Sequence, residues 1–167
     1  MPRRFALDQN FPRPIVETLR EFMTEAELVS LGDIDERLSE LDDWEVLLAL
    51  RHHEEDWDGL ITTDSGMLAL PRELSVLMQT KLTLVVAAAA GHDPLKATGL
   101  VLTYLPWIAA HTQRDMAQVW VLRSGNKPHG DPWETLERVA QRHGRTAQEL
   151  YAEAKLSEAE FAQNPLA

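Results

Sequence analysis

Short apolar runs alternate with helical patterns along the first 124 residues, and this alternation constrains the fold more than any other feature. Five runs have the length and composition of buried strands, namely residues 4–8, 26–32, 59–63, 82–90 and 118–124. An amphipathic stripe over residues 15–23 lies between the first two. Strands alternating with helices are typical of βαβ units. The sequence therefore predicts a three-layer α/β fold, with a mostly parallel central sheet flanked by helices.

Capping signals mark the starts of two further helices. Asp42 and Glu45 have capping-box spacing ahead of the apolar run VLLAL, which predicts a helix from about Asp43 to His53. Residues 93–94, Asp-Pro, have the types preferred at an N-cap and first helical position, and predict a helix to about residue 110. The segment between the second strand and Glu40 fits a loop or a short helix equally well.

Residues 125–132, GNKPHGDP, predict a linker between a domain of residues 1–124 and a C-terminal helical appendage within residues 125–167. Two short helices are expected there, one over about 133–143 and one opened by Thr146 with Glu149 at capping-box spacing. The appendage holds more acidic than basic residues, which argues against a DNA-reading helix-turn-helix. We expect the helices to serve packing or oligomerisation, with partner binding as the alternative.

Composition narrows the function classes. The chain has no cysteine, which excludes disulfides, thiolate metal sites and cysteine nucleophiles and suits a cytoplasmic protein. A formal net charge of −11 opposes non-specific binding to nucleic acid unless cations cluster or a metal ion intervenes. The longest apolar run is too short to cross a bilayer, so no membrane association is expected. Glycine-rich phosphate loops, Gly-x-Ser-x-Gly and His-Glu-x-x-His are absent, which argues against dinucleotide-binding, kinase, esterase and zincin activities.

Three aspartates are predicted to meet at one edge of the sheet. Asp8 ends the first strand and Asp64 ends the third, and ligands of parallel sheets bind beyond the carboxyl ends of the strands. Asp43, in the first turn of its helix, shares a stripe with apolar residues and should turn toward the same edge. Close carboxylates suit a hard divalent cation such as Mg²⁺ or Mn²⁺, which would polarise a phosphodiester and orient a water nucleophile.

Each aspartate also has a simpler interpretation. Asp64 lies in TTDSG, where it would begin a turn, and Asp43 would be a favourable anion at a helix N-terminus. Asp8 has no evident capping role. Glu45 lies in the same helical turn as Asp43 and is an equal candidate for facing the metal. Asp58 precedes its strand and is expected at the opposite edge of the sheet.

Three motifs in order resemble the PIN-like superfamily of metal-dependent ribonucleases, especially its short bacterial, VapC-related branch. Residues 7–12, LDQNFP, resemble its opening Leu-Asp-Glu-Asn-Leu-Pro motif. Residues 43–46, DWEV, resemble its middle acidic segment, and residues 61–67, ITTDSGM, resemble its hydrophobic-Thr-x-Asp-x-Asp-Phe segment. The resemblance covers roughly residues 4–124. It implies a PIN-like fold, dependence on Mg²⁺ or Mn²⁺ and cleavage of RNA, often as the toxin of a toxin–antitoxin pair.

The leading hypothesis is therefore a divalent-metal-dependent ribonuclease. Asp8, Asp43 and Asp64 are the expected metal ligands, and Asn10 is expected to support the site. Two departures from the family pattern weigh against full activity, since Gln9 replaces an acid and position 66, a glycine, replaces the fourth carboxylate.

The alternative hypothesis is a catalytically weak or inactive PIN-like module whose acidic edge and C-terminal helices bind a protein. The expected partners are thus RNA, an antitoxin-like protein or a second copy of the chain. A nuclease should bring Arg3, Arg4, Arg13 or Arg72 near the carboxylates to hold phosphate. If these arginines point away from the carboxylates, the binding-module hypothesis is favoured.

Overall fold

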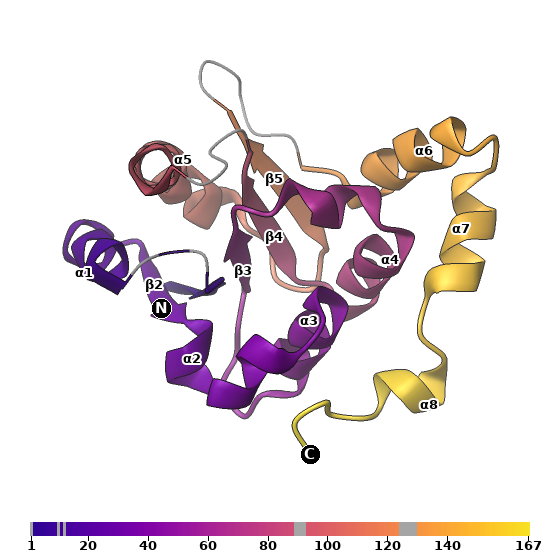
Figure 1. The fold of residues 1–167 in the computed structure, drawn as a ribbon, viewed down its shortest axis with the longest axis horizontal. Helices are drawn as coiled ribbons and strands as arrows, with labels where there is room; N and C mark the ends of the chain where they lie inside the picture. The colour runs from indigo at the N-terminus through magenta and orange to yellow at the C-terminus, as the bar shows by residue number, and fades with distance from the viewer. Residues whose placement is uncertain (1, 10, 12, 89–92, 124–129) are drawn as a thin grey trace.

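A five-stranded, fully parallel sheet forms the centre of the computed structural model, which describes residues 2–9, 11, 13–88, 93–123 and 130–167 (Figure 1). The strand order is β2-β1-β3-β4-β5. The strands are β1 (Arg3–Leu7), β2 (Ala26–Ser30), β3 (Gly59–Thr62), β4 (Thr83–Ala87) and β5 (Gln118–Leu122). The predicted α/β class and the parallel sheet are therefore confirmed.

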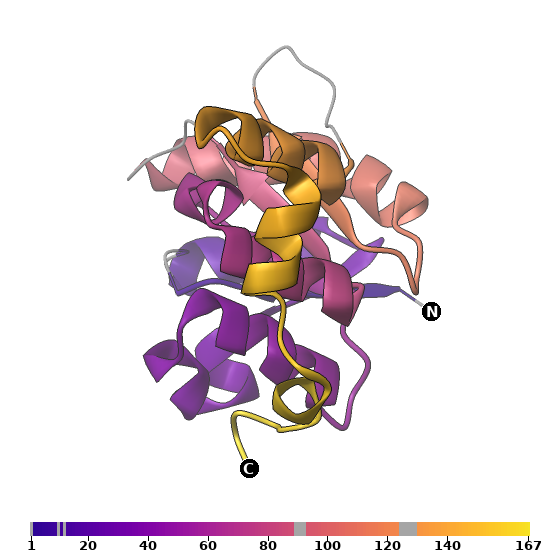
Figure 2. The ribbon, with the colours of Figure 1, turned by 90° about the vertical axis from the view of Figure 1, so that its right-hand side faces the viewer.

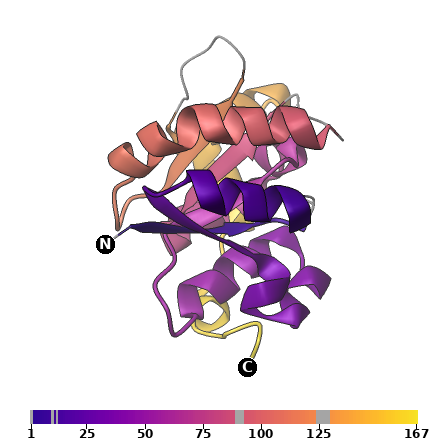
Figure 3. The same cartoon turned by 90° about the vertical axis from the view of Figure 1, so that its left-hand side faces the viewer.

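Helices cover both faces of the sheet and make three layers (Figures 1 and 3). They are α1 (Arg13–Phe22), α2 (Leu31–Ile34), α3 (Asp43–His52), α4 (Pro71–Thr80), α5 (Pro94–His111), α6 (Pro132–Arg142), α7 (Ala147–Ala154) and α8 (Glu158–Phe161), with 3-10 turns η1 (Glu36–Glu40) and η2 (Ser65–Ala69). Helices α1 and α5 lie on one face, and α3 and α4 lie on the other. No helix of the described chain is long and apolar enough to cross a bilayer.

Alternate residues of each strand pack into two separate apolar cores. In β1, Phe5 and Leu7 join the core under α1 and α5, while Ala6 joins the core under α3 and α4. All three side chains are fully buried. Strands covered on both faces show near-continuous apolar runs rather than clean alternation. This explains why the sequence runs predicted strands so directly.

Two consecutive connections leave the sheet toward opposite faces. The β3-α4-β4 and β4-α5-β5 units both advance one strand in the same direction, yet α4 and α5 cover different faces. The two crossovers must therefore have opposite hands. Since about 98% of such crossovers are right-handed, one of this pair belongs to the rare left-handed class.

Helix α4 is the main element that the sequence analysis did not predict. Leu74, Ser75, Val76 and Leu77 are consecutive and all buried. The helix is enclosed by α3 on one side and by α6 and α7 on the other, so it lacks the one-sided apolar stripe of a surface helix. The second strand was also predicted too long, because Leu31 and Gly32 belong to α2.

The two predicted C-terminal helices are present as α6 and α7, and they pack on α4 (Figure 2). Leu74 of α4 contributes to a small core with Leu136, Val139 and Leu150. Beyond α7, the Gln79 side chain donates to the Leu156 carbonyl at 2.9 Å and accepts from its N–H at 2.8 Å. The predicted boundary at residues 124–125 lies outside the described residues.

Candidate functional site

The strand order reverses between β1 and β3, and the predicted acidic residues lie at that point. The chain leaves β1 toward α1 on one face and leaves β3 toward α4 on the other, with Leu7 paired to Ile61. Parallel α/β sheets bind ligands where connections diverge in this way. Asp8 directly follows β1, and Asp64 lies two residues beyond β3.

Thr62 links these two aspartates through one buried hydroxyl. Its Oγ1 donates to Asp8 Oδ2 at 2.7 Å and accepts from the Asp64 backbone N–H at 3.0 Å. The Gln9 N–H donates to Asp8 Oδ1 at 2.7 Å, so the Asp8 carboxylate is held by backbone as well. The sequence analysis did not identify Thr62. A hydroxyl at the end of an otherwise apolar strand, just before an acid, was the available signal.

The Asp64 carboxylate uses one oxygen to cap a turn and leaves the other without a partner in the described chain. It is the N-cap of η2, and its Oδ1 accepts from the N–H of Gly66 at 2.8 Å. The turn interpretation of TTDSG is thus correct. Within the described part of the chain, Oδ2 of Asp64 has no hydrogen bond or ion pair, so this side chain retains an oxygen for a ligand.

Asp43 is half-buried and has no hydrogen bond or ion pair with the described residues. Burial raises the pKa of Asp43 above its usual value, and the charges of Asp8, Asp64 and Asp42 raise it further. Glu45 is not among the charges that raise the pKa of Asp43, and its Oε2 accepts from the Asp42 N–H at 2.9 Å in the predicted capping box. Asp43 is therefore the residue of this turn that is electrostatically coupled to Asp8 and Asp64.

Glu73, in the first turn of α4, extends this group and was missed together with its helix. Burial raises the pKa of Glu73, its own backbone N–H opposes the rise, and the charges of Asp43 and Asp42 add to it. We call Asp8, Asp43, Asp64 and Glu73 the acidic cluster. Position 66 holds a glycine, so Glu73 brings a fourth carboxylate to this region from a different element.

The donor set of the acidic cluster suits a hard cation. It offers only carboxylate oxygens, and the Asp43 carboxylate has no cationic partner among the described residues. The described residues contain no group of three or more His, Asp or Glu side chains placed to hold a metal ion. The carboxylates are thus coupled by charge without being gathered around one point. Asn10, the predicted supporting residue, lies outside the described residues.

The four arginines considered for phosphate binding divide between the two ends of the sheet. Arg3 pairs with Asp58 at 3.0 Å, at the amino end of β3, where Asp58 was predicted to lie. Arg4 is also committed there, to Glu27 and Glu55. Arg13 lies on the side of the acidic cluster but pairs with Asp33.

Arg72 is the arginine whose charge reaches the acidic cluster. Its guanidinium carbon lies 5.5 Å from the centre of the Trp44 ring, and its charge acts against the raised pKa of Glu73. Trp44 directly follows Asp43 at the start of α3, while Arg72 directly precedes Glu73 at the start of α4. The two helix starts therefore bring one cation beside the carboxylates.

Replacing Asp43 with asparagine should stabilise the protein at neutral pH in the absence of divalent metal, by about 0.5 kcal/mol. The pKa of Asp43 is raised in the folded state, so its ionisation opposes folding. Protonation of Asp43 stabilises the folded wild-type protein. This stabilisation is fully present below the unfolded-state pKa of Asp43 and is lost as pH rises through its folded-state pKa. Urea unfolding should show a gain at pH 7 that disappears near pH 3. A less stable variant at pH 7 would contradict the charge repulsion.

Comparison of the chain with family models, with curated proteins and with solved structures finds no match in any of the three.

Proposed function

We propose that this chain is a divalent-metal-dependent ribonuclease of the PIN-like type, acting in the cytoplasm. The observation that carries the proposal is the electrostatic state of Asp43. Its pKa is raised by burial and by the charges of Asp8 and Asp64, and its carboxylate has no cationic partner in the described chain. Repulsion between these carboxylates, of which Asp43 is half-buried and Asp64 exposed, is unfavourable, and a bound cation is its usual relief.

The residues have distinct roles in this proposal. Asp8, Asp43 and Asp64 are not gathered around one point, so they would have to draw closer together to hold Mg²⁺ or Mn²⁺, which when bound polarises a phosphodiester and lowers the pKa of water. Thr62 fixes the orientation of Asp8 through its hydroxyl. Arg72 holds a non-bridging phosphate oxygen.

Glu73 would accept the proton from the attacking water. It is half-buried, and the direction of its pKa shift brings it closer to neutrality, as a general base requires. Its place beside Asp43 puts this proton acceptor within the same region as the proposed ligands. The role of Glu73 is thus separate from that of the three aspartates.

A protein-binding module is the second candidate function. Arg3 and Arg4 are committed to carboxylates at the far end of the sheet, where they contribute nothing to phosphate binding at the acidic cluster. A chain with a net charge of −11 and an acidic edge suits a basic protein partner, such as the antitoxin half of a toxin–antitoxin pair. This candidate needs neither metal nor catalysis.

Mn²⁺ calorimetry and an RNA-cleavage assay separate the two candidates. For the nuclease we expect saturable Mn²⁺ binding, and RNA cleavage that stops on addition of a chelator and returns with excess Mn²⁺. Glu137→Gln is the matched control because it removes an exposed carboxylate on α6, away from the acidic cluster, and should leave both properties unchanged. No Mn²⁺ binding at millimolar concentration, with RNA left intact, would leave only the binding module.

A further inference from the structure

A polar pocket lies at the amino ends of β3, β4 and β5, at the opposite edge of the sheet from the acidic cluster. Its volume is about 210 Å³. Three connections line it, through residues 56–58, 80–82 and 113–115, together with Arg51 from the end of α3. Pockets for drug-sized ligands measure about 300–1,000 Å³. This pocket therefore fits a smaller molecule.

Three cations line the pocket. Arg51 and Lys81 form no ion pair with any described residue. Arg114 places its Nε 3.3 Å from Asp58 Oδ1, but its side chain is 51% exposed and its other guanidinium nitrogens have no partner in the described chain. Arg51 and Lys81 thus keep charges that no described residue pairs with, although the pocket lining also contains three aspartates.

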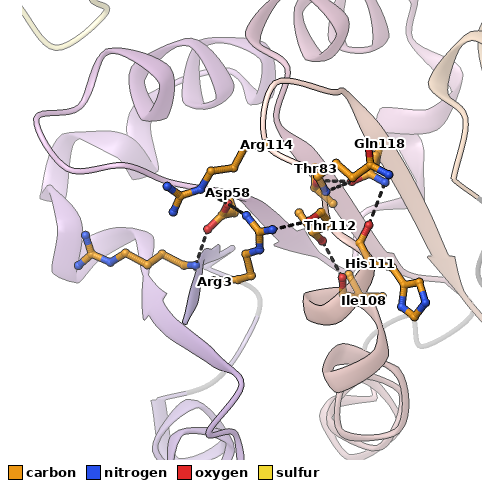
Figure 4. A network of polar contacts seen from close by, with 10 residues as sticks. Arg3, Asp58, Thr83, Ile108, His111, Thr112, Arg114 and Gln118 are labelled. Atoms are coloured by element: carbon orange, nitrogen blue, oxygen red, sulfur yellow. Dashed lines mark hydrogen bonds and ion pairs between the residues drawn. The ribbon is translucent and has the colours of Figure 1, made fainter. Parts of the chain in front are cut away.

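Of the three cations, Arg114 alone pairs with Asp58, whose carboxylate also accepts from two other groups (Figure 4). Its carboxylate is 1% exposed, and it accepts from Arg3 at 3.0 Å and from the Arg4 backbone N–H at 2.9 Å. Asp56 and Asp115 also line the pocket, and neither forms an ion pair with a described residue. The pocket therefore offers three cationic donors and two free carboxylate acceptors.

Two residues of this pocket also have unusual backbone conformations. Lys81 has φ 59° and Asp115 has φ 66°, and they are the non-glycine residues with left-handed backbone in the described chain. Lys81 follows the last turn of α4, where glycine is the usual residue because it adopts this conformation without strain. Residues held in such conformations cluster at ligand sites. Lys81 thus combines a strained backbone with a place in the pocket lining.

We propose that this pocket binds a small phosphate monoester carrying hydroxyl groups. Lys81, Arg51 and Arg114 hold the phosphate, whose two negative charges need several cations. Asp56 and Asp115 accept hydrogen bonds from the hydroxyl groups. The site is separate from the acidic cluster and does not depend on the proposed nuclease activity.

Calorimetric titration of glycerol 3-phosphate into the full chain tests the proposal. The titration is done at low salt, with a chelator present to exclude metal bridging. Saturable binding is expected, and Arg51→Gln and Lys81→Gln should each weaken it about tenfold. Lys81→Gly should weaken it equally and also raise the melting temperature by about 2–4 °C, because the left-handed strain is removed. Lys96→Gln, an exposed charge on α5, is the control and should change neither property.

Different outcomes overturn different parts of the proposal. No saturable binding by the wild type, or unchanged affinity in Lys81→Gly, would overturn the site itself. Inorganic phosphate should bind more weakly than the ester, and equal affinity would overturn the roles of Asp56 and Asp115. All these variants lie outside the acidic cluster, so Mn²⁺ binding should be unaffected and the two proposals fail independently.

Discussion

Replacing Asp8 with asparagine should lower metal-dependent RNA cleavage by about 10²- to 10³-fold while the fold remains intact. A bound divalent ion supplies several kcal/mol of transition-state stabilisation, and each 1.4 kcal/mol is about tenfold in rate. The amide oxygen of asparagine can still accept the Thr62 hydroxyl, which now lies 2.7 Å from Asp8 Oδ2. Initial cleavage rates and Mn²⁺ calorimetry on the same preparation would measure the effect.

Thr62→Val provides a graded comparison for this prediction. It keeps the side-chain shape but removes the hydroxyl that orients Asp8 and accepts from the Asp64 N–H. Partners that orient metal ligands are worth about 10- to 100-fold, so cleavage should fall less than in Asp8→Asn. Glu137→Gln should cleave like the wild type. Wild-type cleavage by Asp8→Asn would show that the acidic cluster is not the catalytic site.

Gly59→Ala should prevent stable folding. Gly59 begins β3 and pairs with Phe5 on one side and Thr83 on the other. A Cβ at this position would overlap the carbonyl oxygen of Thr83 and lie 2.8 Å from its carbonyl carbon. The obstacle is backbone in the middle of a buried sheet, so it cannot move aside. We expect a loss above about 4 kcal/mol, a large part of the 5–15 kcal/mol that stabilises typical domains.

Gly99→Ala is the matched control for the glycine substitution. Gly99 lies in α5, and a Cβ there meets no atom within 4 Å. Removing a glycine from a helix interior should stabilise the protein by about 0.5–1 kcal/mol. Urea unfolding followed by circular dichroism compares both variants. Wild-type stability for Gly59→Ala would contradict the β3–β4 pairing.

The local pattern of the sequence predicted most of the strands because they are short, apolar and bounded by turn residues. It also predicted the start of α3, since Asp42 and Glu45 signal a capping box within four residues. It could not predict α4 in the same way. That helix is buried on several sides by elements distant in sequence, so its apolar residues follow no helical stripe.

The residues of the acidic cluster also divide into those that the local sequence predicts and those that depend on residues distant in sequence. The positions of Asp8 and Asp64 at strand ends follow from the apolar runs before them. The sequence predicted the Asp42–Glu45 capping box but left open whether Asp43 or Glu45 faces the other carboxylates. Glu73 joins the site through the charge of Asp43, about 30 positions away, and Thr62 through a hydrogen bond to Asp8, about 54 positions away. No local pattern identifies these partners.

The reversal of face between α4 and α5 has a consequence for the carboxyl edge of the sheet. The chain leaves β3 toward one face, and it leaves both neighbours of β3 in the sheet, β1 and β4, toward the other. The connection that leaves β3, the strand that precedes Asp64, therefore diverges from the connections that leave its two neighbours. The carboxyl edge of the sheet therefore has two points of divergence, one on each side of β3, and such points are where parallel sheets bind ligands.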